Sequence, residues 1–96
     1  MNYTKGEWQI HPNFYKFIAV REDGLFTTIA VTEEIHGDKE MARANAHLIS
    51  AAPDMYEALR DLMFQFAVAV EQPHSVDTRI YNQAEQALAK AEGREG

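Results

Sequence analysis

The chain contains no cysteine, and this absence removes several kinds of chemistry. Without thiols the protein forms no disulfide, no zinc ribbon and no thiol redox motif. A small fold that does without disulfides is typical of a reducing compartment. We therefore expect a cytoplasmic protein.

Long apolar runs are also missing. The N-terminal residues contain no apolar signal-peptide core, and the longest apolar stretch covers residues 66–70. A membrane-spanning helix needs about 20 apolar residues, so this stretch is far too short. These features predict a soluble protein without a membrane partner.

Basic residues are scarce. The chain has nine Lys and Arg residues and fifteen Asp and Glu residues, which gives a net charge of −6. Affinity for nucleic acid comes largely from cations that neutralise phosphates, so direct binding of DNA or RNA is disfavoured. The acidic residues are scattered, and this pattern favours a solvated surface over mimicry of DNA.

A length of 96 residues limits the chain to one hydrophobic core. With 46% hydrophobic and 25% charged residues, the composition is that of an ordinary globular protein. We expect a single α+β domain over residues 1–96. Its predicted architecture is a small antiparallel β-sheet of about three strands, followed by two or three helices packed on one face.

Asp23-Gly24 is the strongest local signal in the first third of the chain. Both residues tolerate the positive φ of a two-residue hairpin turn. The turn predicts four cross-strand pairs: Glu22–Leu25, Val20–Thr27, Ile18–Ile29 and Lys16–Val31. One face of the sheet then carries Ile18, Val20, Ile29 and Val31. The other carries Tyr15, Phe17, Ala19, Phe26, Thr28 and Ala30.

Three helices are predicted after the sheet. The first covers residues 38–51 with Asp38 as its N-cap, and its apolar stripe is Met41, Ala44, Leu48, Ile49 and Ala52. Pro53 ends this helix and begins a second one over residues 53–71, with a stripe of Met55, Leu59, Leu62, Met63, Phe66 and Val70. Ser75 caps a third helix that ends before Gly93, with a stripe of Val76, Ile80, Ala84, Ala87, Leu88 and Ala91.

Residues 44–53 are Ala-Asn-Ala-His-Leu-Ile-Ser-Ala-Ala-Pro. This segment resembles one that recurs in small proteins of tailed phages and prophages, usually as Ala-Asn-Ala-Arg-Leu-Ile-Ala-Ala-Ala-Pro. The likeness extends to Gly6-Glu7-Trp8, to Ile18-Ala19-Val20 and Ile29-Ala30-Val31, and to residues 87–93. His47 stands where arginine is common. The resemblance implies a phage origin and no established active site.

Catalytic and metal-binding motifs are missing. The chain has four histidines: His11, His36, His47 and His74. Their spacings match none of those found among zinc ligands. Paired acids around the start of the first helix could act in acid/base chemistry, and the four carboxylates there are Glu33, Glu34, Asp38 and Glu40. The electrostatics of the helix start explain Asp38 and Glu40 without such a role. Since no Gly-rich phosphate loop, nucleophile elbow or Ser/His/Asp set occurs, we expect a non-enzymatic protein without cofactor or metal.

Asn45 is the most suggestive polar residue, because asparagine is mildly unfavourable inside a helix. We interpret it as a buried amide that hydrogen-bonds strand or loop backbone and locks the helix onto the sheet. A ligand contact is the alternative. The first interpretation predicts that Asn45→Ala costs ~1–3 kcal/mol of stability.

Aromatic and cationic residues supply the candidate partner-binding sites. Phe64 projects from the stripe of the second helix, and Phe17 and Phe26 lie on the second sheet face, so all three are candidates for dimer or partner contact. A nucleotide signal would need convergent cations and aromatic rings, and the available set is Arg43, His47, Arg60 and Tyr56.

The sequence favours an accessory phage protein that binds a host protein or itself. Inhibition of a host defence system, in the manner of an anti-CRISPR protein, is the sharpest form of this hypothesis, and it rests on analogy. The alternatives are a small-molecule module that sequesters a nucleotide signal and a structural homodimer.

Overall fold

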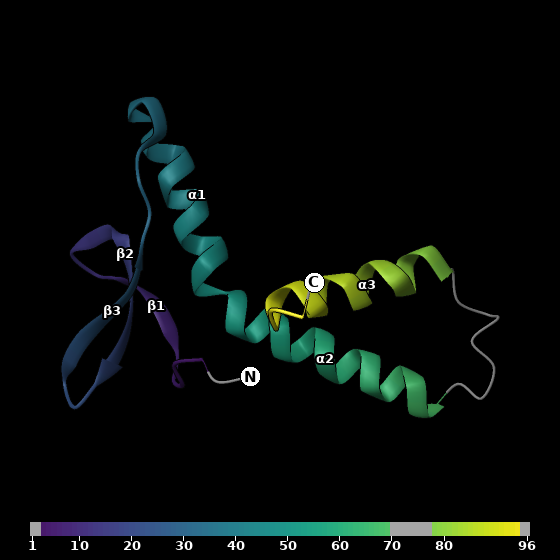
Figure 1. Cartoon of the computed structure of the whole chain (residues 1–96). Coiled ribbons are helices and arrows are strands. Elements are labelled where there is room, and N and C mark those ends of the chain that lie inside the picture. Colours follow the sequence, from purple (N-terminus) through teal and green to yellow (C-terminus); the bar gives the residue numbers. More distant parts are fainter. Residues whose placement is uncertain (1–2, 70–77, 95–96) are drawn as a thin grey trace. The chain divides into compact units, whose positions relative to one another are not determined.

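The computed structural model describes residues 3–69 and 78–94. The described residues form two compact units, one ending at Pro53 and the other beginning at Asp54. The first unit contains three strands, the short 3-10 helix η1 (Ile35–Gly37) and helix α1, and the second contains α3 and most of α2 (Figure 1). The single domain over residues 1–96 stays a prediction.

An antiparallel sheet is the framework of the first unit. Strands β1 (Trp8–His11), β2 (Phe14–Glu22) and β3 (Leu25–Val31) lie in this order, with β2 at the centre. Aromatic and β-branched residues are frequent in these strands, and they suit a pleated, half-buried surface. A three-stranded antiparallel sheet followed by helices confirms the predicted α+β class.

The turn between β2 and β3 is the predicted hairpin. Asp23 has a φ of 52° and Gly24 a φ of 79°, and a two-residue turn of this kind needs positive φ at both positions. Glu22 pairs with Leu25 directly beside the turn. The predicted register is therefore confirmed next to the hairpin.

A β-bulge shifts the register farther along the hairpin. Ile18 pairs with Ala30 and Phe17 with Val31, which leaves Ile29 as an extra residue in β3. The predicted pairing of Ile18 with Ile29 is wrong, and so is the predicted partner of Val31. A shift of one residue moves a side chain to the other face, so Val31 lies with Phe17 and is 48% exposed.

Helix α1 (Lys39–Ser50) begins as predicted. The Asp38 carboxylate accepts a hydrogen bond from the backbone N–H of Met41 over 3.0 Å, which caps the first turn. A single non-helical residue separates α1 from helix α2 (Ala52–Ala69), which has Pro53 in its first turn. The separation of two helices at Pro53 is confirmed, because proline fits the first turn and disrupts an interior one.

The alanine face of α1 packs against the sheet. Ala42 and Ala46 are fully buried, as is Ile18 of β2, and the Thr32 hydroxyl donates a hydrogen bond to the Ala42 carbonyl oxygen over 3.1 Å. Thr32 stands two residues after Ala30, the partner of Ile18, so α1 covers the Ile18 face of the sheet. The predicted stripe of the first helix is wrong in four members, which are exposed: Met41, Ala44, Leu48 and Ala52.

In the second unit, α2 and α3 (Thr78–Ala91) each have one face that is less exposed than the rest of the helix. The half-buried residues of α2 include Tyr56, Leu59, Met63 and Phe66, a spacing that follows one helix face. Leu88 of α3 is buried. Five members of the predicted stripes are exposed instead: Met55, Leu62, Ile80, Ala87 and Ala91. The predicted positions Val70, Ser75 and Val76 lie outside the described residues.

Candidate functional site

Four aromatic rings gather on the sheet face opposite α1, and we call them the aromatic face: His11, Phe14, Phe17 and Phe26. The His11 ring centroid lies 4.7 Å from that of Phe26 and 5.0 Å from that of Phe14, and the Phe14 and Phe17 centroids are 5.4 Å apart. Phe17 and Phe26 are half-buried, whereas Phe14 is 55% exposed. The structure therefore places the predicted Phe17 and Phe26 in one cluster.

Sequence reasoning missed His11 and Phe14 as members of this face. They flank the turn at residues 12–13, and a two-residue connection between strands brings the residues on either side of it together. That position was the signal that could have identified them.

Glu34 gathers polar side chains beyond the end of β3. The Tyr15 hydroxyl donates a hydrogen bond to Glu34 Oε1, and Lys16 Nζ lies 3.5 Å from the same oxygen. The hydrogen bond to Glu34 and desolvation raise the pKa of Tyr15, and the same bond, with help from Lys16, lowers the pKa of Glu34. Arg43, one of the nucleotide candidates, has its guanidinium carbon 4.7 Å from the Tyr15 ring centroid.

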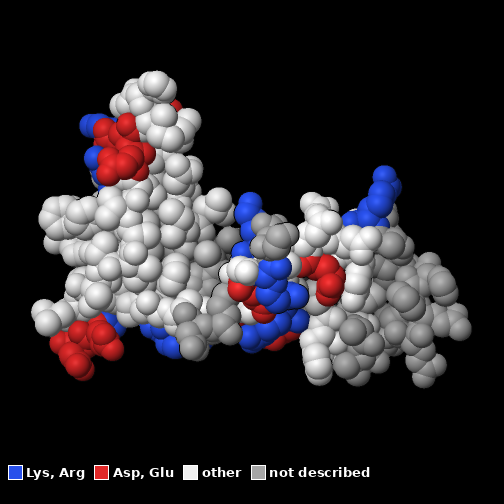
Figure 2. Space-filling model, in the orientation of Figure 1, with Lys and Arg blue, Asp and Glu red and all other residues white. Residues whose placement is uncertain are grey.

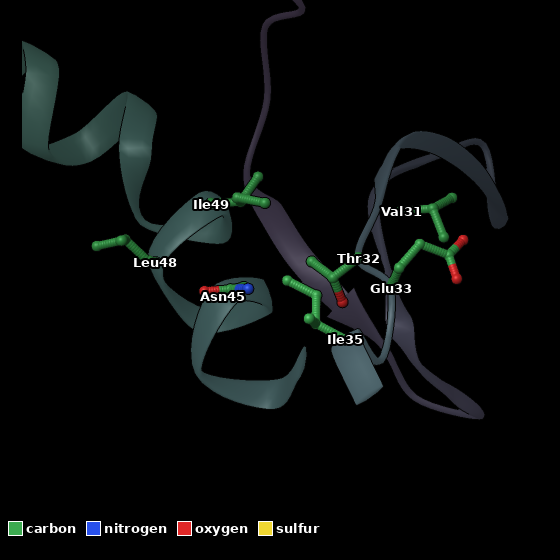
Figure 3. A pocket seen from close by; sticks show the side chains of 7 residues that line it. All are labelled: Val31, Thr32, Glu33, Ile35, Asn45, Leu48 and Ile49. Atoms are coloured by element: carbon green, nitrogen blue, oxygen red, sulfur yellow. The ribbon is translucent and has the colours of Figure 1, made fainter. Parts of the chain in front are cut away.

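A groove of about 300 Å³ lies between α1 and the chain that follows β3 (Figure 3). Its lining is mostly apolar and consists of Val31, Thr32, Glu33, Ile35, Asn45, Leu48 and Ile49. Ile35 is 52% exposed and Leu48 is 62% exposed. Because small-molecule sites bury most of their ligand, an open groove at the lower limit of their volumes is better suited to side chains of a partner protein.

The Asn45 side chain lies among the groove residues in Figure 3 and is half-buried. Within the described residues its amide has no hydrogen-bond partner. The interpretation of Asn45 as the amide that locks α1 onto the sheet is therefore wrong. The Thr32 hydroxyl makes that connection instead, and the Asn45 amide is accessible from the groove.

The second unit exposes Phe64, whose side chain is 65% accessible. Tyr56 Oη donates a hydrogen bond to Glu92 Oε2 over 2.7 Å, and Arg94 Nε donates one to Glu92 Oε1 over the same distance. The Tyr56–Glu92 bond raises the pKa of Tyr56 and lowers that of Glu92. Arg60 lies with its guanidinium carbon 5.5 Å from the Tyr56 ring centroid.

The four nucleotide candidates are divided between the two units. Arg43 and His47 lie on α1, and Tyr56 and Arg60 lie on α2. Among these four residues, Arg60 contacts Tyr56 through its guanidinium group, which lies over the Tyr56 ring. Over the same residues, no three His, Asp or Glu side chains gather as metal ligands would, and no helix is long and apolar enough to cross a membrane.

A family model described as Salmonella phage P22 protein Y8K6 matches residues 1–95. The chain belongs to this family. Comparisons with curated proteins and with solved structures found no match. Membership of the P22 protein family confirms the expected relation to phage proteins.

Proposed function

We propose that this member of the P22 protein family acts by binding another protein through its aromatic face and catalyses no reaction. The exposed ring of Phe14 beside three further rings is the observation that supports the proposal. Covering apolar surface contributes about 25 cal/mol per Å². Aromatic and arginine side chains dominate binding energy at interfaces, and the Arg21 guanidinium carbon lies 5.9 Å from the Phe26 ring centroid.

The proposed partner is a protein of the bacterial host, met in the host cytoplasm. Inhibition of a host defence system is the sharpest form of the proposal, by analogy with other small phage proteins. A homodimer is the second candidate, because the aromatic face and the exposed Phe64 would serve self-association equally well. Sequestration of a nucleotide has weaker support. A nucleotide would need all four candidate residues to converge, and the contact that supports this function is the one between Arg60 and Tyr56.

Affinity capture from host lysate, with identification by mass spectrometry, tests the proposal. Phe14→Glu places a charge on the aromatic face, and Ile80→Glu places the same charge on a side chain of α3 that is 63% exposed. A charge at a desolvated interface weakens binding by about a hundredfold or more. We expect the wild type and Ile80→Glu to retain the same host protein and Phe14→Glu to lose it. Equal retention by all three would refute the aromatic face as the binding surface.

Light scattering distinguishes a host partner from a second copy. The chain mass is 10.9 kDa, and a homodimer would show twice this mass. If the aromatic face forms the dimer, Phe14→Glu restores the monomer, whereas Phe64→Glu does so if α2 forms it. A monomeric wild type that retains no host protein would contradict the whole proposal.

A further inference from the structure

Strand β3 is an edge strand with an unusual composition. It is the last strand in the sheet order, and none of its residues from Leu25 to Val31 is charged (Figure 1). Edge strands are usually protected from pairing by lysine, proline or a bulge, and β3 has only the bulge at Ile29. The Thr32 N–H bonds the Lys16 carbonyl of β2. Because N–H groups alternate in direction along a strand, the Val31 N–H points toward the free edge.

The groove begins at the end of this strand. Val31 and Thr32 line it, and Ile35 and Leu48 present exposed apolar side chains farther along. The Asn45 amide carries two N–H donors and a carbonyl acceptor, which together match the hydrogen-bonding groups of a peptide backbone. A strand that paired with the last residues of β3 would therefore enter a groove that offers both apolar contact and an unbonded amide.

Acidic residues flank the uncharged strand at both ends. Glu22 and Asp23 precede β3, Glu33 follows it, and all three are exposed. Figure 2 shows acidic atoms at the hairpin end and, beside basic atoms, at the η1 end of this unit, with an uncharged area between the two ends. In an antiparallel pair of two β3 strands, Glu22 and Asp23 of one copy would approach Glu33 of the other. Like charges in such positions oppose pairing, so the charge pattern disfavours a second copy.

We propose that the free edge of β3 binds an extended segment of a partner protein by strand addition. The segment is uncharged over about seven residues, the length of β3, and carries Lys or Arg at both ends. Its backbone pairs with β3, its flanking cations face Glu22, Asp23 and Glu33, and its end enters the groove, where Asn45 bonds its backbone. This inference rests on the proposed function and specifies the partner's shape and charge.

Synthetic peptides test the inference on the full chain. The probe alternates Thr and Val and carries Lys at both ends, and it is matched by the same core with Glu at both ends. Each exposed ion pair is weak, but several together are expected to make the Lys-flanked peptide bind about tenfold more tightly than the Glu-flanked one. Fluorescence anisotropy measures the two affinities, and the difference between them should shrink at high salt. A Lys-flanked peptide with a central proline is expected not to bind, since proline interrupts the ladder.

Four variants locate the binding site. Val31→Pro removes the N–H at the free edge and should abolish binding, whereas Val31→Thr keeps that N–H and should bind normally. The double variant Glu22→Lys/Glu33→Lys should reverse the preference, so that the Glu-flanked peptide binds better. Asn45→Ala should weaken binding without lowering thermal stability. Circular dichroism confirms that each variant is folded.

Several outcomes would overturn the inference. They are the absence of saturable binding, equal affinity for the two flanked peptides, and undiminished binding by a folded Val31→Pro variant. A wild-type dimer that Val31→Pro converts to a monomer would identify a second copy as the occupant and also overturn it. If the peptide fails to bind while Phe14→Glu still abolishes capture of a host protein, the proposed function stands and this inference alone is wrong.

Discussion

Two polar residues of the groove, Thr32 and Asn45, provide a sharp test of how α1 is held to the sheet. The Thr32 hydroxyl is buried and hydrogen-bonded to the Ala42 carbonyl, whereas the Asn45 amide is half-buried and has no partner within the described residues. Substitutions at the two positions should therefore change stability in different directions. Thr32→Val keeps the shape of the side chain and removes its hydroxyl, and Asn45→Ala removes the amide.

The magnitudes follow from these environments. Loss of the Thr32 hydrogen bond costs about 1 kcal/mol, since a net hydrogen bond contributes roughly that amount. Asn45→Ala loses no hydrogen bond and replaces a poor helix former by the best one, so the expected change lies between zero and a gain of about 0.5 kcal/mol. For a chain of this size, 1 kcal/mol corresponds to about 4–8 °C in Tm. Thr32→Val should melt at least about 4 °C below Asn45→Ala.

Thermal melts followed by circular dichroism at neutral pH measure the difference. Wild type is the reference. The Ser50 hydroxyl donates a hydrogen bond to the His47 carbonyl oxygen over 2.9 Å in the last turn of α1, so Ser50→Ala controls for the loss of a local hydrogen bond within this helix. A loss of ~1–3 kcal/mol in Asn45→Ala would restore the buried-amide interpretation. It would refute the assignment of Asn45 to the groove.

Further predictions concern the core, the polar cluster and a helix end. Ile18 is fully buried, so Ile18→Val should cost about 0.5–1.5 kcal/mol and Ile18→Ala about 2–5 kcal/mol in denaturant unfolding. Glu34 has a lowered pKa, so its contribution is present above its unfolded pKa and lost as the pH falls through the folded pKa. Tyr15→Phe should therefore lower Tm at neutral pH and flatten its decline below about pH 4.5. Gly93 has a φ of 72° and open space at its Cβ position, so Gly93→Ala should cost about 1 kcal/mol through backbone strain alone.

Local sequence chemistry was sufficient for the strands and helices of the α+β class and for several of their boundaries. The Asp23-Gly24 turn, the Asp38 cap and the break at Pro53 are all present as predicted. Gly93 also ends α3, because its own N–H and that of Arg94 bond carbonyl oxygens in the last turn. Each of these features depends on residues within one turn of each other, so the sequence contains the whole cause.

Tertiary structure decided which face each element buries. The bulge at Ile29 moved Val31 to the aromatic face, and bulges depend on pairing between strands more than on the local residue types. Small residues form the interface of α1 because the helix lies close to the sheet, and a hydrophobicity pattern favours the larger Met41 and Leu48. The candidate surfaces therefore followed only in part from sequence.

The sequence by itself determined the α+β class, the element order and the kinship with phage proteins. Only the tertiary structure showed that Asn45 lacks a partner within the described residues, and that the end of β3 lines the groove beside α1. The physical reason is range: helix caps and turns are set by neighbours in the chain, whereas hydrogen bonds and burial between distant segments are set by register and by the volume of facing side chains.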